Sequence, residues 1–418
     1  MAGSTPGTPF SPWLAASEIV GRIANAVVAI VAISAFGLPS PLDVLIIMLA
    51  FWVTIAVHEA GHAVMALAVG HRLFEIRIGV GPTLRFHLGR TRMLLGPVPG
   101  LGYVVSLSDD ARGYRMNRLI VGMAGMAMNA LVLGWLFLHG ITTGLTTSLA
   151  VFNGLAFVSS FLPVVTKTSM GPLRTDGLMV LRTLVATPTD LDEERASFHS
   201  VQAQLLVEAG DPDAARAELG SGLEHHPGSP SLRGWMGYHL IQAHRYREAR
   251  ELFSSLADPA DDQGRTVEPH VRAAYLNNLS WADLMTGDED LLDEAETASA
   301  RALELLPENP SIMGTRGFAL ICNGSYLEGV FLAEKAYAKH RIPKDRAASA
   351  AIVSIGRAMN WRFSDAERWL ATARESDADC PLLERASQEL ERRRSEPNPA
   401  WDLEGTWSSD HGRVAESG

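Results

Sequence analysis

The sequence predicts a mainly α-helical protein in two parts: a polytopic transmembrane helical core of about four spans, with a small β-containing loop, and then an α-helical solenoid. Three observations favour this fold class. The mean hydropathy of the 418 residues is +0.07, too apolar for an ordinary soluble protein and too polar for a chain that is membrane throughout. The two halves carry opposite charge, and from about residue 196 long apolar runs give way to short amphipathic helices.

The formal net charge of −11 is the sum of two unlike halves. Up to Arg182 there are 12 Lys and Arg against 7 Asp and Glu, a balance of +5, and the remainder holds 24 against 40, a balance of −16. Such asymmetry is typical of a membrane or tail arrangement. The acidity of the second half argues against nucleic acid as its partner. Two cysteines, Cys322 and Cys380, are too few for a disulfide framework or a Cys-rich metal site.

Four long apolar stretches predict the membrane spans. Each reaches the roughly 20 residues that a helix needs to cross about 30 Å of hydrocarbon. Buried core helices of a large soluble protein are the alternative, which four such runs in so short a segment disfavour. The predicted spans are Ile19–Leu38, Leu42–Gly70, Leu119–Leu138 and Ile141–Val165.

The basic residues predict how these spans are oriented. The connectors at Pro39–Pro41 and His139–Ile141 carry no Lys or Arg, whereas the segment His71–Arg118 carries eight arginines. Basic loops stay on the cytoplasmic side. We therefore expect an integral, multi-pass membrane protein with both termini and the long middle loop in the cytoplasm, in a bacterial inner membrane.

A recurring helical pattern covers Ala196 to Arg394. Small residues fall where two helices cross closely, and aromatic side chains stand beside them. Gly237, Tyr246, Ala249 and Phe253 have the same spacing as Gly317, Tyr326, Gly329 and Ala333. This pattern resembles the tetratricopeptide repeat of roughly 34 residues, which implies a solenoid whose concave surface binds a cytosolic protein or peptide. An unrelated all-helical domain is the alternative.

These patterns divide the chain into five segments. We expect a disordered leader over residues 1–18, a transmembrane domain over 19–182 and a linker over 183–195. The repeat domain follows over 196–394, and a disordered tail over 395–418.

The chemistry is predicted to lie within the second span, at His58-Glu59-Ala60-Gly61-His62. Histidines four residues apart lie on one helical face, so both imidazoles can bind one Zn²⁺. Glu59, beside the metal, can deprotonate a zinc-bound water and hand the proton to a leaving amine. Because such residues are costly inside a lipid-spanning helix, their location favours a metal site over a polar packing cluster without metal.

A third protein ligand would leave one tetrahedral position open for water. With the histidine motif, Ser160-Phe161-Leu162-Pro163 and Thr175-Asp176-Gly177 resemble the site-2 protease family of intramembrane zinc metalloproteases, peptidase family M50, over about Leu42–Leu181. In that family the HExxH helix is joined by an Asn-x-x-Pro…Asp-Gly element whose Asp is the third ligand. The resemblance therefore implies this role for Asp176.

Two departures from the family pattern stand at this element. Ser160 occupies the place of the usual Asn, and twelve residues separate Pro163 from Asp176 where about four is common. Other acids near a span remain weaker candidates for the third ligand, and these are Asp43, Glu75, Asp109 and Asp110.

The loop between the second and third spans is predicted to contain short strands at Phe74–Ile78, Leu84–His87 and Tyr103–Leu107. A sheet edge there could receive an extended substrate by strand addition, and a membrane-surface hairpin is the alternative. Gly125 with Asn129 resembles the family's small-residue-plus-Asn pattern, which packs against the active-site helix.

We therefore predict an intramembrane zinc metalloendopeptidase that cleaves membrane-anchored protein substrates in the lipid bilayer. One Zn²⁺ per chain would be held by His58, His62 and Asp176, and Glu59 would be catalytic. The repeat domain would bind a substrate or a regulator. The alternative is a catalytically inactive membrane-anchored scaffold, which Ser160 and the long spacer before Asp176 support. A zinc transporter is a third function, which is disfavoured because the predicted spans carry no further His or acid residues that could form a path for the ion.

Overall fold

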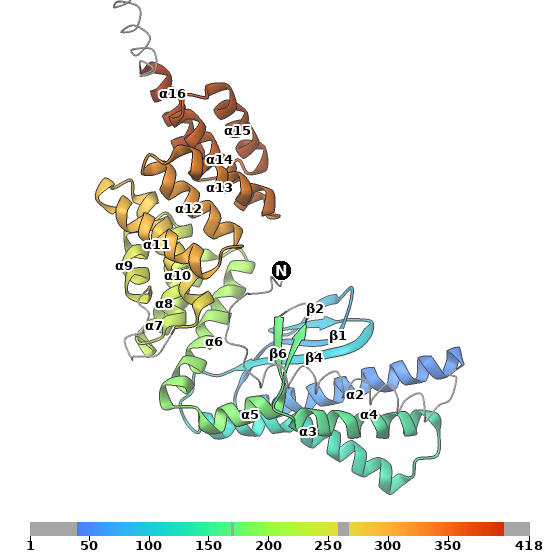
Figure 1. The fold of residues 1–418 in the computed structure, drawn as a ribbon. Helices are drawn as coiled ribbons and strands as arrows, with labels where there is room; N and C mark the ends of the chain where they lie inside the picture. Colours follow the sequence, from blue (N-terminus) through green and yellow to red (C-terminus); the bar gives the residue numbers. More distant parts are fainter. Residues whose placement is uncertain (1–39, 169–170, 258–266, 397–418) are drawn as a thin grey trace, which may run out of the picture. The chain divides into compact units, whose positions relative to one another are not determined.

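The computed structural model describes residues 40–168, 171–257 and 267–396 (Figure 1). The chain forms two compact units, one extending to Leu232 and the other beginning at Arg233. The expected leader, the expected first span Ile19–Leu38, and the expected tail after residue 396 lie outside the described residues.

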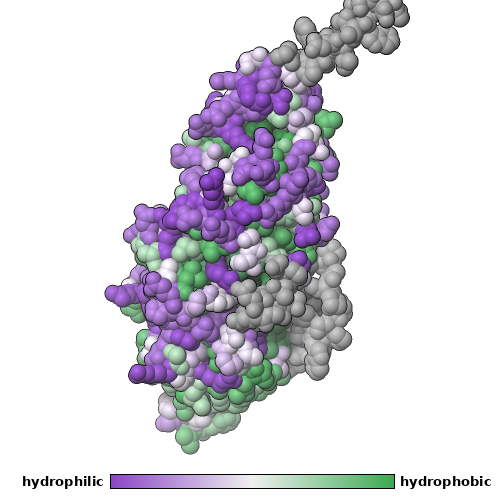
Figure 2. Space-filling model, turned by 90° about the vertical axis from the view of Figure 1, so that its left-hand side faces the viewer, coloured by the Kyte–Doolittle hydropathy of each residue, from purple (hydrophilic) through white to green (hydrophobic). Residues whose placement is uncertain are grey.

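Among the described residues of the first unit, three helices are long and apolar enough to cross a membrane. They correspond to the second, third and fourth expected spans. Large apolar side chains cover their outer faces: Leu45, Leu131 and Leu138 are 62, 67 and 85 % exposed. Figure 2 shows hydrophobic residues gathered over the lower part of the first unit, at the height of α3 and α4 in Figure 1. A surface of this kind fits a lipid environment. The helices are α2 (Pro41–Ala68), α3 (Tyr114–His139) and α4 (Gly144–Phe161).

A four-stranded sheet lies against α2, in the order β2-β3-β1-β4. The outer strand β4 pairs antiparallel with β1, and β3 pairs parallel with β1 and antiparallel with β2. The three strands expected from the sequence are present, and β3 is an additional one. The strands are β1 (Arg72–Val80), β2 (Leu84–Leu88), β3 (Thr91–Leu95) and β4 (Val98–Leu107).

After α4 the chain forms a short hairpin of β5 (Val165–Thr168) and β6 (Gly171–Arg174), and then α5 (Asp176–Val185). The helices α6 (Pro188–Glu208) and α7 (Pro212–His225) complete this unit. Residues 183–195, which we expect to be a linker, are thus the end of α5 and the start of α6. A capping box between Thr187 and Asp190, with Pro188 in the first turn, begins α6 within that segment.

Helix α6 is held on the sheet and on α3 by charged and aromatic contacts. Arg92 of β3 pairs with Glu208, its Nη1 lying 2.7 Å from the carboxylate Oε2. Arg118 pairs with Glu194. Phe74 of β1 contacts Phe198 edge to face, with ring centroids 5.5 Å apart. Because these contacts come from α6 itself, the helix is part of the first unit.

The second unit is an array of paired helices, as the resemblance to tetratricopeptide repeats implies. Proline begins α10, α12 and α14, the first helices of three successive pairs. Phe253 and Phe318 are fully buried in its core. The helices are α8 (Pro230–Gln242), α9 (Tyr246–Leu256), α10 (Pro269–Thr286), α11 (Leu292–Leu305), α12 (Pro310–Cys322), α13 (Tyr326–Lys339), α14 (Pro343–Met359), α15 (Phe363–Ser376) and α16 (Leu383–Ser395), with the 3-10 turn η1 (Glu289–Leu291) before α11.

Two glycines of α12 provide a test of this packing. A Cβ at Gly317 would lie 2.7 Å from the carbonyl oxygen of Gly329 on α13, whereas one at Gly314 would meet only ordinary contacts, the nearest 3.5 Å away at Ser349 Oγ. We expect Gly317→Ala to lower the free energy of unfolding by about 1–3 kcal/mol. Gly314→Ala should raise it by up to about 1 kcal/mol, because alanine favours a helix. Denaturation of the full-length protein in detergent measures both, and shifts of the same sign would contradict this packing.

Candidate metal centre

The predicted histidine pair lies on α2 where that helix crosses α3. Gly61 allows the crossing, because a Cβ there would lie 2.7 Å from the carbonyl oxygen of Ala124. The close approach places His58 and His62 against Gly125 of α3. Glu59 and His62 are buried, and His58 is partly buried. Gly61 on α2 and Gly125 on α3 thus allow the two helices to approach closely enough to enclose the histidine pair.

Partners on α3 orient both imidazoles. His62 Nδ1 donates to the carbonyl oxygen of Val121 at 2.7 Å. The side-chain amide of the fully buried Asn129 lies beside His58, with its Nδ2 2.9 Å from His58 Nδ1; rotation of the amide by a half-turn would place its oxygen there to accept a proton from Nδ1. With a proton on each Nδ1, each Nε2 has a lone pair, which is the form in which histidine binds a metal. Both lone pairs are therefore available on the same side of α2.

The structure brings Asp176 to these two nitrogens. The Nε2 atoms of His58 and His62 lie 3.2 Å apart. The carboxylate oxygens of Asp176 lie 2.8 Å from His58 Nε2 and 3.4 Å from His62 Nε2. Ligands of a tetrahedral zinc ion with bonds of about 2.0–2.2 Å are separated by roughly 3.3–3.6 Å. The three side chains therefore fit a zinc ion after shifts of a few tenths of an ångström.

Gly125 leaves the space that such an ion needs. A Cβ on Gly125 would lie 2.6 Å from His58 Nε2 and in contact with His62 Nε2. The space in front of the two nitrogens thus exists because residue 125 has no side chain. Together with the donor set, this space fits one small divalent cation.

The long spacer before Asp176 does not move it away from α4. Within the spacer, β5 and β6 pair antiparallel, and Thr175 N donates to the carbonyl oxygen of Val164 at 3.1 Å. Gly177 packs against the end of α4, where a Cβ would lie 2.8 Å from the carbonyl oxygen of Ser160. Asp176 therefore begins α5 directly beside the Ser160–Pro163 element.

The other acids considered for the third ligand have other partners. Asp43 caps α2 through Ser40, whose N–H lies 3.0 Å from its carboxylate. Glu75 accepts from Arg92 and from the hydroxyl of Tyr103, and burial together with this bond to Glu75 raises the pKa of Tyr103. Asp110 Oδ1 accepts from Arg112 N at 2.8 Å, and Asp109 belongs to a separate cluster.

Glu59 lies against the outer strand of the sheet. A Cβ on Gly102 of β4 would lie 2.6 Å from Cγ of Glu59 and 2.7 Å from Cγ2 of Ile55. Trp52 Nε1 donates to the carbonyl oxygen of Gly96 at 3.1 Å and ties the segment before β4 to α2. Strand β4 therefore passes beside Glu59. No motif in the sequence around Gly102 predicts this contact.

A core of membrane-length helices with a buried histidine pair, a nearby carboxylate and an adjacent glutamate defines the class of membrane-embedded metallopeptidases. The sequence model of peptidase family M50 matches residues 46–360. The chain belongs to peptidase family M50, in agreement with the resemblance seen in its motifs.

Individual relatives match parts of the chain. A Clostridium acetobutylicum protein described as a candidate zinc metalloprotease is 34 % identical over 114 residues, which are 25 % of this chain and 34 % of that protein. The chain thus spans about a third of the length of this relative. A tetratricopeptide-repeat protein of Thermus thermophilus is 17 % identical, with a TM-score of 0.36, over 47 % of this chain and 98 % of that one. The PilF protein of Pseudomonas aeruginosa is 15 % identical, with a TM-score of 0.35, over 51 % and 88 %.

Removing the partner of His58 should weaken metal binding without removing a ligand. We expect Asn129→Leu to lower zinc affinity roughly 10–100-fold, because the imidazole loses the group that fixes its tautomer. Asn129→Asp keeps an acceptor for the Nδ1 proton and should retain most of the affinity. Competition with a zinc-binding dye measures both variants. Equal affinities for Asn129→Leu and the unaltered protein would contradict this orienting role.

Proposed function

We propose that this protein is an intramembrane zinc endopeptidase that cleaves membrane-anchored protein substrates. The observation that carries the proposal is the convergence of His58, His62 and Asp176 beside Glu59, between helices whose outer surfaces fit lipid. Membership of peptidase family M50 supports peptide-bond hydrolysis as the reaction of this site. One zinc ion per chain would be held by the three side chains.

The chain's own residues supply binding, orientation and proton transfer. A bound zinc ion would supply a Lewis acid for the scissile carbonyl and lower the pKa of water. Glu59 accepts the proton of the attacking water and delivers it to the leaving nitrogen. Val121 accepts the Nδ1 proton of His62, and Asn129, with its amide oxygen turned to the ring, would accept that of His58, so that both Nε2 lone pairs point to the metal position. Gly102 keeps β4 close enough to Glu59 for a substrate on that strand to reach it.

The outer strand β4 is the proposed docking edge for the substrate. Among the described residues its ladder partner is β1 on one side only, so the other edge offers backbone N–H and C=O groups. An extended segment that pairs there would pass beside Glu59. A substrate transmembrane helix must therefore unwind locally before its peptide bond reaches the site.

The repeat array is the proposed binding site for a cytosolic peptide or protein. The first helices of successive pairs line a groove within the second unit, with Tyr238, Asn278, Trp281, Thr315 and Lys344 on its wall. Amide and aromatic side chains of this kind can bind both the backbone and the side chains of an extended peptide. We propose that this groove recruits a substrate or a regulator, on the cytoplasmic side of a bacterial inner membrane.

Reconstitution tests the proposal. The full-length protein in proteoliposomes should cleave a panel of single-span reporter proteins. A chelator should abolish the cleavage, and added Zn²⁺ should restore it. Absence of cleavage by zinc-loaded protein across the panel would instead support the inactive scaffold.

A further inference from the structure

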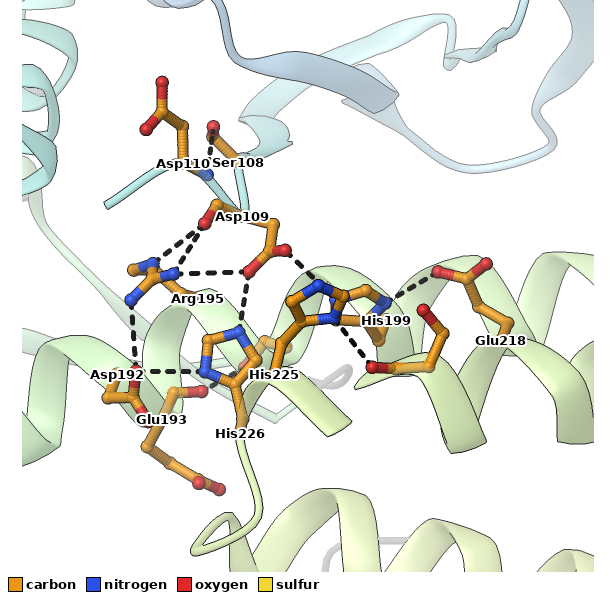
Figure 3. A network of polar contacts seen from close by, with 12 residues as sticks. Ser108, Asp109, Asp110, Asp192, Glu193, Arg195, His199, Glu218, His225 and His226 are labelled. Atoms are coloured by element: carbon orange, nitrogen blue, oxygen red, sulfur yellow. Dashed lines mark hydrogen bonds and ion pairs between the residues drawn. The ribbon is translucent and has the colours of Figure 1, made fainter. Parts of the chain in front are cut away.

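A second cluster of potential metal ligands lies outside the peptidase centre. Asp109 follows β4, and the imidazoles of His199 on α6 and His225 at the end of α7 face it (Figure 3). One ligand atom from each of these three residues lies within 4.8 Å of the others. All three belong to the first unit, although 90 and 116 positions along the chain separate Asp109 from the two histidines.

The hydrogen bonds of the cluster leave lone pairs directed at its centre. His199 Nδ1 donates to Glu218 Oε1 at 2.8 Å. Its Nε2 is buried, has no hydrogen-bond partner and lies 3.4 Å from Asp109 Oδ2, and the side chain is only 7 % exposed. His225 Nδ1 donates to the carbonyl oxygen of Ser221 at 2.8 Å, so in the neutral ring the lone pair is on Nε2. A buried imidazole nitrogen that faces a carboxylate at 3.4 Å is satisfied either by a proton on the ring or by a metal cation between the two groups.

The residues around the cluster hold these donors in place. His226, which is fully buried, lies between two carboxylates, with its Nε2 2.6 Å from Asp109 Oδ1 and its Nδ1 2.9 Å from Asp192 Oδ1. Arg195 Nη2 donates to the backbone carbonyl of Asp109 at 2.7 Å. These bonds direct Oδ2 of Asp109 at His199, and Glu218 behind the imidazole matches the carboxylate–histidine arrangement that orients metal ligands.

Helix α7 also leaves room for the central imidazole. A Cβ on Gly222 would lie 2.8 Å from Cγ of His199, so only glycine permits this ring between α6 and α7. The separation of 3.4 Å between carboxylate and imidazole equals the one between Asp176 and His62 in the peptidase centre. The cluster thus has the donor types of a zinc site, and the separation of Asp109 and His199 matches that of zinc ligands.

We propose that Asp109, His199 and His225 bind a second divalent transition-metal ion, zinc in the first instance. Two imidazoles and one carboxylate provide three ligands, and the exposed side of His225 leaves the fourth position to water. The ion would fasten the loop after β4 to α6 and α7. Because β4 also passes Glu59, the site would fix the strand beside the peptidase centre without taking part in its chemistry.

Metal content tests this site separately from the first. The full-length variant H58A/H62A/D176A lacks the ligands of the peptidase centre. After dialysis against metal-free buffer it should retain one equivalent of Zn²⁺, and titration with Co²⁺ should give visible absorption of a low-symmetry site. Adding H199A/H225A should remove both signals. Adding His270→Ala, which removes an exposed histidine elsewhere, should leave both unchanged.

Substitution of the exposed His225 alone distinguishes loss of a metal ligand from misfolding of the variant. In the otherwise native chain His225→Ala should lower the affinity of this site at least tenfold and leave the folded protein intact by circular dichroism. Loss of zinc from the H58A/H62A/D176A variant on dialysis would overturn the proposal. Retention of zinc by that variant after H199A/H225A is added would overturn it as well. If the peptidase centre itself binds no zinc, the native chain should still hold one equivalent that H199A/H225A removes.

Discussion

Glu59→Gln should retain zinc and lose proteolysis. We expect cleavage of a membrane-anchored reporter to fall about 10²–10⁴-fold, because glutamine cannot accept the proton of the attacking water. The zinc content should stay unchanged, since Glu59 is not among the converging ligands His58, His62 and Asp176. Reporter cleavage in proteoliposomes and metal analysis of the same preparation measure the two effects.

Asp43→Asn is the matched control, because Asp43 is the other acid on α2 and caps its first turn far from the histidines. It should keep both zinc and cleavage. Cleavage by Glu59→Gln within tenfold of the unaltered protein would contradict the role of this residue as the base. Loss of zinc together with cleavage would show instead that Glu59 supports the metal.

Gly125→Ala should weaken metal binding although it removes no ligand. The new methyl group would lie 2.6 Å from His58 Nε2 and would occupy the space proposed for the ion. If the helices relax only partly, the loss corresponds to about 1–3 kcal/mol of binding free energy, or roughly 10–100-fold in zinc affinity. Competition with a chelating dye measures this affinity, and cleavage should fall in parallel.

Gly134→Ala on the same helix provides the comparison. A Cβ at Gly134 meets no other atom within 4 Å, so this variant should bind zinc normally. Normal zinc affinity in Gly125→Ala would contradict the proposed metal position. A comparable loss in both variants would show that the effect comes from α3 in general and would contradict it equally.

Local patterns predict the elements whose signals are local. Apolar length indicates the three membrane-length helices that the structure describes, and the spacing of His58 and His62 indicates a shared helical face. The recurrence of Gly237 and Gly317 indicates the close crossings in the repeat array. These features depend on residues within one or two helical turns or on a repeating unit, so the sequence carries them directly.

Features that depend on long-range pairing are not predictable in the same way. The short strand β3 lacks an alternating pattern, and its pairing with β1 on one side and β2 on the other makes it a strand. The spacer before Asp176 is compatible with the site because Val165 pairs with Arg174. By sequence alone, Asp109 is only a weak candidate ligand of the first metal centre. Its contacts with His199 and His226 are not predictable, because these histidines come from segments far along the chain.

Zinc content of the peptidase centre alone is the most direct test of the central claim. In a chain carrying H199A/H225A, the centre formed by His58, His62 and Asp176 should retain one zinc per chain after dialysis. Asp176→Ala in that chain should reduce the zinc content to near zero, and Asp110→Ala, an exposed acid with a local partner, should leave it at one. Full zinc content in the Asp176→Ala chain would contradict the proposed ligand set.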